Sequence, residues 1–400
     1  MLPTLDQLDV PGKRVLVRAD LNVPLDDEGV SDPARIRAAA PTILEIIDKG
    51  GVPIVMSHLG KPKGERDPAL SLERVRPALA DALDGARVRF AESLEAAAEL
   101  AEAAQPGEVI LLENLRFDAG EKDNDDAFAQ RLAALGDVYV DDAFSAAHRA
   151  HASIVGVPEH LPAAAGRLME REIASLETHL GAPERPFMAI LGGAKVSSKF
   201  GLLRALVGRV DCVALAGGMA NTMLAAEGKG IGRSIHEADA IGEVKKIRAA
   251  AEAAECEILL PVDAVVAKDP EDTFPKVVDI ASVPDDAVIL DIGPKSAERI
   301  ADRIGGMRTV VWNGPLGMAE RAAFAKATEK IARTISDRTK AGDLISVVGG
   351  GDTNAAVDRA GALGDVSYVS LAGGAFLQWL EGRELPGVAA LGEIRIEAQD

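Results

Sequence analysis

The chain has 400 residues, of which 48% are hydrophobic and only 3% are aromatic. This length exceeds that of one compact unit of typical size, so it predicts two domains. The formal net charge of −19 argues against nucleic acids and anionic membranes as partners, because a negatively charged protein repels polyanions such as phosphate backbones.

The cysteines and the N-terminus indicate a cytoplasmic protein. The two cysteines, Cys212 and Cys256, lie in or beside apolar runs, and they match neither a disulfide framework nor a metal-ligand spacing. The first twelve residues lack the pattern of a secretory signal, and no uncharged apolar run reaches membrane-spanning length. We therefore expect a soluble cytoplasmic protein with reduced thiols.

The first part of the chain alternates apolar runs with helical patterns. We expect strands near residues 15–17, 53–56, 109–112 and 138–140, and helices near residues 34–48, 71–83, 94–104 and 125–135. Such alternation predicts a parallel sheet with right-handed crossovers.

The pattern breaks at residues 156–166, where Pro158, Pro162 and Gly166 stand, and an amphipathic helix at 168–179 follows. A second series of expected strands then lies near residues 187–191, 212–216, 258–260, 288–292, 309–312, 344–348 and 366–370. The predicted fold class is α/β, with two doubly wound parallel-sheet (Rossmann-like) domains. The first domain is placed at residues 1–165 and the second at 181–385, and a hinge helix at 166–180 joins them.

Ligands of open α/β sheets bind beyond the carboxyl ends of the strands. In the first half of the chain, the residues that follow the expected strands or open the first helix are polar and mostly basic: Arg18, Asp20, Asn22, Arg35, His58, Lys61, Arg116, His148, Arg149 and His151. Each one alone is typical of a solvated surface. Together, in so acidic a protein, they predict a site for a small anion.

In the second half, glycines follow the expected strands instead. The stretch Leu191 to Lys199 (LGGAKVSSK) reads as strand, tight turn and helix start, with Lys195 and Lys199 four residues apart. Two glycines allow close approach of the backbone, and a helix start attracts anions. The stretch is neither a Walker A loop nor a GxGxxG motif. A plain turn with solvated lysines remains the alternative.

The stretch Gly349 to Thr353 (GGGDT) is the sharpest of these glycine motifs. Three glycines open a helix start, at which Asp352 is able to hold Mg²⁺ and Thr353 to donate to a phosphate. A capped turn with Asp352 as the N-cap is the alternative. The division between a basic half and a glycine-rich half predicts a small polyanion in the first domain and a Mg-nucleotide in the second. Phosphoryl transfer between them needs cations rather than a nucleophilic side chain.

Taken together, these motifs resemble the phosphoglycerate kinase family, over nearly the whole chain from Arg14 to Leu391. The stretches that carry the resemblance are RVLVRADLNVP from Arg14, RIRAAAPTI from Arg35, SHLGKP from Ser57, LLENLRF from Leu111, residues 137–156 ending in AHRAHASIVG, residues 192–199, WNGPLGMAE from Trp312, GGGDT from Gly349 and EGRELPGVAAL from Glu381.

The resemblance implies reversible transfer of the acyl phosphate of 1,3-bisphosphoglycerate to MgADP, which gives 3-phosphoglycerate and MgATP. It implies Mg²⁺ with ATP or ADP as co-substrate, a monomer, and no nucleic acid or membrane partner. It also implies closure about the hinge helix, and a C-terminal tail, residues 386–400, that packs back on the first domain.

The resemblance also implies roles for single residues. The triose site would comprise Asp20, Leu21, Asn22, Arg35, His58, Leu59, Gly60, Lys61, Arg116 and Arg149. The nucleotide site would comprise Lys195, Lys199, Gly217, Gly293, Asn313, Pro315, Glu320, Gly350, Gly351, Asp352 and Thr353, with Asp352 as the metal ligand. Catalysis would depend on Arg35, Lys195, Gly350 and Gly351.

The chain departs from the family pattern in four places. Lys61 stands where the family usually has Arg, Asp141 replaces a usual Asn, Ser145-Ala146 replaces Gly-Thr, and Ser370-Leu371-Ala372 replaces Ser-Thr-Gly. None of these changes removes Arg35, Lys195 or Asp352, so we expect altered affinity or closure with activity retained.

Two other function classes fit the sequence less well. A non-catalytic binding scaffold of the same fold would be favoured by loss of Arg35, Lys195 or GGGDT, and all three are present. An NAD-dependent dehydrogenase would need GxGxxG followed by an acidic residue about 20 positions later. That fingerprint is missing.

Overall fold

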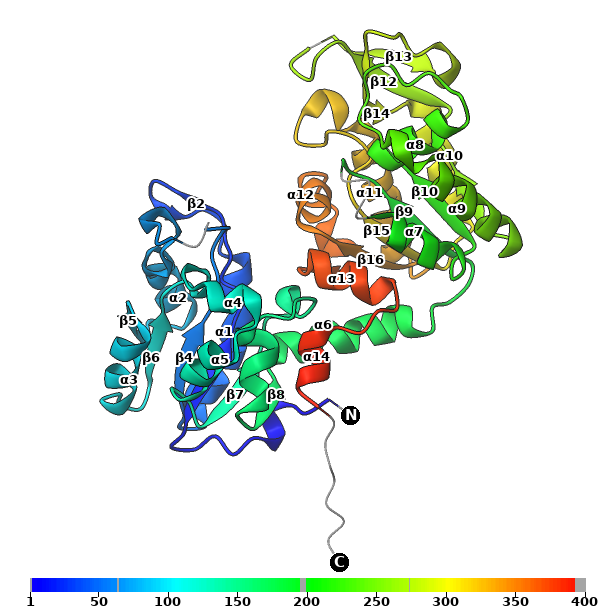
Figure 1. Ribbon diagram of the computed structural model, residues 1–400. Helices are drawn as coiled ribbons and strands as arrows, with labels where there is room; N and C mark the ends of the chain where they lie inside the picture. Colours follow the sequence, from blue (N-terminus) through cyan, green and yellow to red (C-terminus); the bar gives the residue numbers. More distant parts are fainter. Residues whose placement is uncertain (1, 63–64, 195–198, 273, 393–400) are drawn as a thin grey trace, which may run out of the picture. The chain divides into compact units, whose positions relative to one another are not determined.

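The structure, a computed structural model, describes residues 2–62, 65–194, 199–272 and 274–392. The chain divides into two compact units (Figure 1). Unit 1 comprises Met1–Ala174 and the segment from Glu384 onward, and unit 2 comprises Ser175–Arg383.

Unit 1 is built on a six-stranded parallel sheet. Its strand order is β5 (Arg87–Ala91), β6 (Glu108–Leu112), β4 (Val52–Met56), β1 (Arg14–Arg18), β7 (Val138–Asp141) and β8 (Ala163–Ala165). A two-stranded ribbon, β2 (Leu25–Asp26) and β3 (Gly29–Val30), lies outside this sheet. The chain reverses its direction of winding between β1 and β7, which are neighbours, and this is where a ligand is expected.

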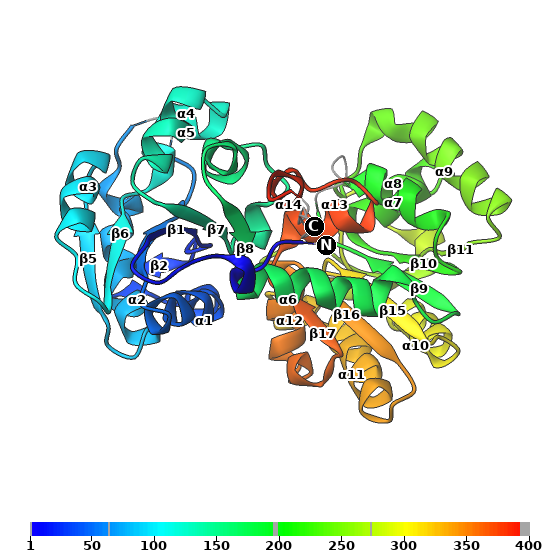
Figure 2. The same ribbon diagram turned by 90° about the horizontal axis from the view of Figure 1, so that it is seen from below.

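Helices cover both faces of this sheet. They are α1 (Ala34–Asp48), α2 (Arg76–Ala82), α3 (Leu94–Glu102), α4 (Ala119–Asp123), α5 (Asp126–Ala133) and α14 (Pro386–Ala390). Figure 2 shows α1 and α2 on one face of the strands and α4 and α5 on the other. Apolar residues of α1 and of the strands, such as Ile36, Ile43 and Val17, form the core between them. The predicted doubly wound architecture of this half is confirmed.

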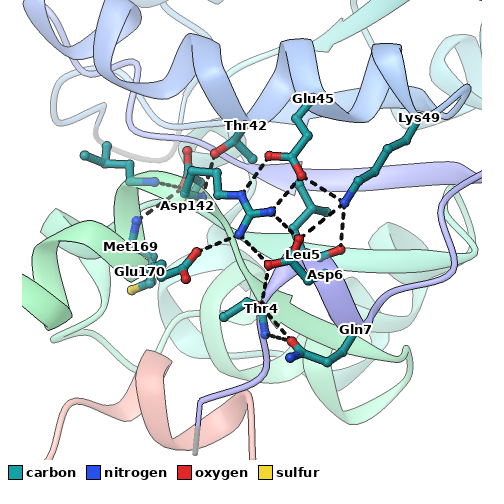
Figure 3. Close-up of polar contacts among 12 residues, drawn as sticks. Thr4, Leu5, Asp6, Gln7, Thr42, Glu45, Lys49, Asp142, Met169 and Glu170 are labelled. Carbon is teal, nitrogen blue, oxygen red and sulfur yellow. Dashed lines mark hydrogen bonds and ion pairs between the residues drawn. The ribbon is translucent and has the colours of Figure 1, made fainter.

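The connecting helix α6 (Arg167–Leu176) begins in unit 1 at a dense polar cluster (Figure 3). The Arg167 guanidinium donates to both oxygens of Glu45, each at 2.7 Å, and also pairs with Asp6 and Glu170. Hydrogen bonds from Arg167 lower the pKa of Glu45 to about 2. Asp142 Oδ1 accepts the backbone N–H groups of residues 168 and 169, at 2.8 and 3.2 Å. The start of α6 is therefore fixed to α1 and β7.

The division between the units falls inside α6, between Ala174 and Ser175. The helix ends at Leu176 and is followed by a π-helical turn, Glu177–Gly181. The described part of the C-terminal segment, residues 384–392, belongs to unit 1, where the Gly387 N–H donates to the Ala147 carbonyl at 2.8 Å. Residues 393–400 of the predicted tail lie outside the described residues.

Unit 2 contains a second six-stranded parallel sheet. Its order is β11 (Glu257–Leu259), β10 (Cys212–Leu215), β9 (Phe187–Leu191), β15 (Thr309–Asn313), β16 (Ile345–Gly349) and β17 (Tyr368–Ser370). Its helices are α7 (Phe200–Val207), α8 (Gly217–Ala226), α9 (Ile241–Ala253), α10 (Pro294–Gly305), α11 (Lys326–Lys340), α12 (Gly351–Arg359) and α13 (Gly373–Leu380). In Figure 2, α7 to α9 lie on one face of the sheet and α10 to α12 on the other.

One predicted strand of unit 2 belongs elsewhere. Residues 288–292 were expected in the doubly wound sheet, but β14 (Val288–Ile292) pairs antiparallel with β12 (Asp263–Ala267), and β12 also pairs antiparallel with β13 (Lys276–Asp279). That prediction was wrong because a short apolar run does not reveal its partner strand. This three-stranded sheet has its own small core, which includes Ala264 and Val266.

Both cysteines are buried and free, as predicted. Burial raises the pKa of the Cys212 thiol to about 12 and that of Cys256 to about 11. They are therefore inert packing residues.

Candidate active site

In unit 1, the loops that follow β1 and β7 meet at Asp20. Asp20 Oδ2 accepts a hydrogen bond from Arg35 Nη1 at 2.8 Å, and the Ser145 hydroxyl bonds to the same oxygen. Arg35 Nη1 also donates to the Asn22 carbonyl at 3.2 Å. Asp20 is buried and Arg35 is not. The carboxylate thus holds the guanidinium of α1 at the carboxyl ends of the strands.

The loop after β4 is tied to its neighbours through Gly60. Its N–H donates to Asn22 Oδ1 at 2.8 Å, and its carbonyl accepts from Arg116 Nη1 at 2.6 Å. Gly60 has a φ of +63°, and a Cβ there would lie 2.6 Å from the side chain of Leu70. A left-handed, crowded position of this kind favours glycine. The Gly60 backbone therefore links the Asn22 and Arg116 side chains.

A cluster of cations surrounds His58, which is buried. Burial, followed by the positive charges of Arg18, Arg116, Arg149 and Arg35, holds the pKa of His58 well below its usual value. The imidazole is therefore neutral near pH 7.

The arginines of this cluster also crowd one another. Burial lowers the pKa of Arg116 to about 10, with further lowering by Arg149 and Arg18. Burial and Arg18 likewise lower the pKa of Arg149. Arg116 Nε is buried without a hydrogen-bond partner among the described residues. Like charges held this close predict that a small anion binds among them and relieves their repulsion.

In unit 2, the corresponding position lies between β9 and β15, where the winding again reverses. Here the loops touch through their backbones. A Cβ on Gly192 would lie 2.0 Å from the Pro315 carbonyl oxygen, and one on Gly217 would lie 2.5 Å from that of Gly193. Gly217 has a φ of +59°. Glycine is needed at both positions because any side chain would displace the neighbouring backbone.

The start of α12 is joined to the loop after β15. Thr353 Oγ1 accepts from the Gly314 N–H at 2.7 Å, and Asn313 Nδ2 donates to the Gly349 carbonyl at 2.7 Å. Gly350, the N-cap of α12, has a φ of +101°. The first turn of α12 is thereby fixed with its N–H groups at the carboxyl end of the sheet, where they favour an anion.

Beside this helix start lies a cavity of about 640 Å³. Its walls are largely apolar and come from α8, from β14 of the three-stranded sheet and from the short 3-10 helix Ile280–Ser282 that follows β13, for example Leu224, Val288 and Ile280. Four of the predicted nucleotide residues line it: Gly217, Pro315, Glu320 and Asp352. An apolar pocket of this size with a few polar groups and a helix N-terminus suits a nucleoside that carries phosphates.

Comparison with known proteins agrees with this arrangement. The family model for phosphoglycerate kinase matches residues 5–383. The chain belongs to the phosphoglycerate kinase family. Phosphoglycerate kinases of Rhizorhabdus wittichii and Xanthobacter autotrophicus are 52% and 53% identical to it, over 97% of this chain and 98% of theirs.

Solved structures show the same relation. The phosphoglycerate kinase of Coxiella burnetii aligns with a TM-score of 0.84 at 37% identity, covering 98% of this chain and 99% of the other. That of Pyrococcus horikoshii aligns with a TM-score of 0.82 at 30% identity, covering 98% of both chains. Members of the family are enzymes, kinases that use a carboxyl group as acceptor, so the catalytic class is supported and the non-catalytic scaffold is not.

Several predicted nucleotide residues of this phosphoglycerate kinase fold lie beside the cavity without lining it. Gly293, the N-cap of α10, packs against Asp263. Asn313 Nδ2 donates to the Gly349 carbonyl. Lys199 is buried, and its Nζ donates to the Gly192 carbonyl at 2.7 Å. Lys195 lies outside the described residues. Gly351 opens α12, and a Cβ there would meet nothing within 4 Å.

The remaining predicted triose residues differ in exposure. Leu21 and Leu59 are buried, and their N–H groups donate to Ser57 Oγ at 2.9 Å and to Asn114 Oδ1 at 3.2 Å. Lys61 is exposed at the end of the same loop. The structure thus gives the two leucines a backbone role and leaves the Lys61 ammonium accessible.

Two departures from the family pattern, Asp141 and Ser145, lie at the end of β7 and in the loop that follows it. Ser145 bonds to Asp20, as described above. Burial raises the pKa of Asp141 to about 7, and its Oδ2 has no hydrogen-bond partner among the described residues. A third departure, Ser370-Leu371-Ala372, keeps the family's serine, and Ser370 Oγ accepts from the Ala372 N–H at 3.2 Å. Nothing in the structure explains the Leu371 and Ala372 replacements.

Sequence reasoning missed Asn114, which organises the triose loops. Its Oδ1 accepts from the N–H groups of Leu59 and Arg116, and its Nδ2 donates to the carbonyls of Leu59 and Leu70. The signal was present, since Asn114 follows β6 as closely as Arg116 does. The apolar wall from the three-stranded sheet was also missed, because that sheet was not recognised.

The described residues hold no group of three or more His, Cys, Asp and Glu side chains able to bind a metal. Within the same residues, no helix has the length and apolar character needed to cross a bilayer.

Proposed function

We propose that this chain transfers the acyl phosphate of 1,3-bisphosphoglycerate to MgADP and catalyses the reverse reaction with 3-phosphoglycerate and MgATP. One observation carries the proposal. A single chain that matches the family model over residues 5–383 has a cluster of crowded cations in one unit and a nucleoside-sized cavity at a helix start in the other. The reaction requires two binding sites of these kinds.

The triose would bind in unit 1. Arg116 and Arg149 carry surplus positive charge among buried groups, so a phosphate or carboxylate would pair with them. Asp20, which pairs with Arg35, and Asn22, which accepts from the Gly60 N–H, would accept from the triose hydroxyl and hold the loop around it. Lys61 is exposed and would meet the phosphate as a point charge, because an ammonium lacks the planar fork of Arg.

The nucleotide would bind in unit 2, with its base between the apolar walls and its ribose hydroxyls on Glu320. Its phosphates would meet the N–H groups at the start of α12 and Lys199. Asp352 lines the cavity in the first turn of that helix. A single carboxylate fits Mg²⁺ that is held mainly by phosphates and water, as is usual for this ion. When bound, Mg²⁺ would neutralise charge on the phosphates.

The acceptor carboxylate is already an anion, so no general base is needed. Arg35 is held by Asp20 through one nitrogen, which leaves other N–H groups for the reacting carboxyl group. Lys195 and the N–H groups of Gly350 and Gly351 would stabilise the phosphoryl group during transfer.

Transfer requires the two substrates to meet. We therefore propose hinge closure about residues 166–180, which include α6, with the tail at 386–400 serving unit 1. We propose a monomer of the cytoplasm with small-molecule substrates and no nucleic acid or membrane partner. The net charge of −19 supports the last point.

The test is formation of ADP from MgATP and 3-phosphoglycerate by the purified chain in a coupled assay. We expect robust activity that Lys195→Ala abolishes and that an exposed lysine variant on α9, Lys245→Ala, leaves intact. Nucleotide binding without any ADP formation would overturn the proposal in favour of a binding scaffold.

A further inference from the structure

Arg18 is the most buried of the basic residues at the strand ends of unit 1, with 1% of its surface exposed. Its guanidinium makes three hydrogen bonds: Nη1 to the Ala19 carbonyl at 2.6 Å, Nε to Ser153 Oγ at 2.9 Å, and Nη2 to His58 Nδ1 at 3.1 Å. The side chain therefore joins β1 to the loops after β4 and β7.

The contact with His58 determines which ring nitrogen carries the proton. A guanidinium has donors and no acceptor, so His58 Nδ1 has to accept the hydrogen bond. Because the imidazole is neutral, its one proton lies on Nε2. His58 then offers a neutral N–H donor to an anion among the arginines, without adding another charge to a crowded cluster.

Arg18 is linked through Ser153 to a buried carboxylate, that of Glu121. Glu121 is 0% exposed; its Oε1 accepts from Ser153 Oγ at 2.7 Å and its Oε2 from the Ser153 N–H at 3.0 Å. His151 Nδ1 lies 3.6 Å from the same Oε1. The Tyr139 hydroxyl donates to the Ser153 carbonyl at 2.8 Å. The Ser153 hydroxyl thus bridges a buried cation and a buried anion, which fixes the orientation of the guanidinium.

We propose that Arg18 is a positioning residue of the triose site, which locks His58 in its Nε2–H tautomer and is itself oriented by Ser153 and Glu121. The value of this arrangement for catalysis rests on the proposed binding of the triose by His58. Four cations face His58, from β1, α1 and the loops after β6 and β7: Arg18, Arg35, Arg116 and Arg149. Three of them remain when Arg18 is replaced, so His58 stays surrounded by positive charge. The effect on its tautomer can therefore be distinguished from an effect of lost charge.

The test is NMR of the full chain labelled with ¹⁵N in histidine, read through couplings between ring protons and ring nitrogens. The chain has 6 histidines, and His58→Gln identifies the relevant signal. We expect His58 to show a protonated Nε2 and an accepting Nδ1 near pH 7. In Arg18→Gln we expect both tautomers, titration at higher pH, and a KM for 3-phosphoglycerate raised about tenfold. The value of kcat should change less, and the KM for MgATP should stay unchanged.

Further variants separate positioning from charge and from folding. Arg18→Lys keeps the charge but does not reach Ser153 and His58 together, so it should resemble Arg18→Gln. Ser153→Ala leaves Arg18 in place without its Nε acceptor, and should give a smaller effect in the same direction. It serves as the test if Arg18 variants do not fold. Arg14→Gln is the matched control, because it removes a partly exposed Arg–Asp137 pair at the other end of β1.

Three outcomes would overturn the proposal: a protonated Nδ1 in the parent chain, an unchanged His58 spectrum in Arg18→Gln, or full restoration by Arg18→Lys. Failure of the triose assignment looks different. In that case His58→Gln would bind 3-phosphoglycerate as tightly as the parent chain does, while the tautomer shift in Arg18→Gln would still be observed.

Discussion

The two candidate binding sites of this protein both suit anions, but they are constructed differently: charged side chains dominate one, and closely packed backbone dominates the other. The site of unit 1 consists of side chains, and its cations crowd around the buried His58. In the site of unit 2 the loops at the carboxyl end of the sheet touch through their backbones, so closely that Gly192 and Gly217 have no room for a Cβ. The comparison teaches that ligand binding should respond most to charge deletions in the first site and to added side-chain volume in the second.

Lys195→Ala should have the largest effect and sharpens the comparison, because it removes a side-chain cation from the backbone-built site. We expect kcat to fall by roughly 10³, since this charge would act on the phosphoryl group in transfer. Single-turnover kinetics with MgATP and 3-phosphoglycerate measure it. A loss of only a few-fold would remove Lys195 from its proposed role.

Arg35→Ala tests whether a cation of unit 1 acts in transfer or only in binding. We expect kcat to fall by about 10², as for loss of one stabilising donor. The Kd for 3-phosphoglycerate should change less, because Arg116 and Arg149 remain. Calorimetric titration alongside steady-state kinetics gives both numbers. Equal losses in Kd and kcat would make Arg35 an anchor only.

Gly192→Ala tests the backbone construction of unit 2. A Cβ would lie 2.0 Å from the Pro315 carbonyl oxygen, so we expect destabilisation of about 1–3 kcal/mol and weaker MgADP binding. Binding of 3-phosphoglycerate should be unaffected. Gly305→Ala is the matched control, because a Cβ there meets nothing within 4 Å at the end of α10. Unchanged MgADP affinity in Gly192→Ala would show that the loops can move apart enough to accommodate a Cβ, and would contradict the backbone construction.

The smallest effect concerns stability and pH. Burial raises the pKa of Asp141 from 3.8 to about 7. The unfolded chain therefore releases this proton at lower pH than the folded chain does, and the carboxyl group costs stability increasingly as pH rises from about 4 to 7. Asp141→Asn cannot ionise, so its thermal midpoint should exceed that of the parent by a few degrees at pH 8 and by less at pH 5. A pH-independent difference in midpoint would contradict this pKa.

The sequence predicted the elements that carry their own signals. The helix at residues 34–48 was predicted at its observed bounds, and the strands that meet at both switch points were found, because apolar runs and helical periodicity are local properties. Residues 71–83 were expected to be one helix, but α2 begins only at Arg76 after a short 3-10 helix, Leu72–Val75. Pro77 suits the first turn of an α-helix and explains the late start.

The rest of the site depended on contacts between distant residues. Arg18 and His58 were both noticed as polar residues after strands, but their hydrogen bond, and the link through Ser153 to Glu121, joins positions up to 135 residues apart. Likewise, the run at 288–292 gave no sign of its antiparallel partners, and so the apolar wall of the nucleotide cavity was not foreseen. Pairing and side-chain direction across the fold are not local properties.

The most direct test of the account is NMR of the full chain with labelled methyl groups, titrated separately with 3-phosphoglycerate and with MgADP. The account predicts that 3-phosphoglycerate shifts methyl signals of residues 1–174 near β1, β4 and β7, and that MgADP shifts those lining the cavity of unit 2, such as Leu224, Ile280 and Val288. If both ligands shifted signals of the same unit, the assignment of one substrate to each unit would be contradicted.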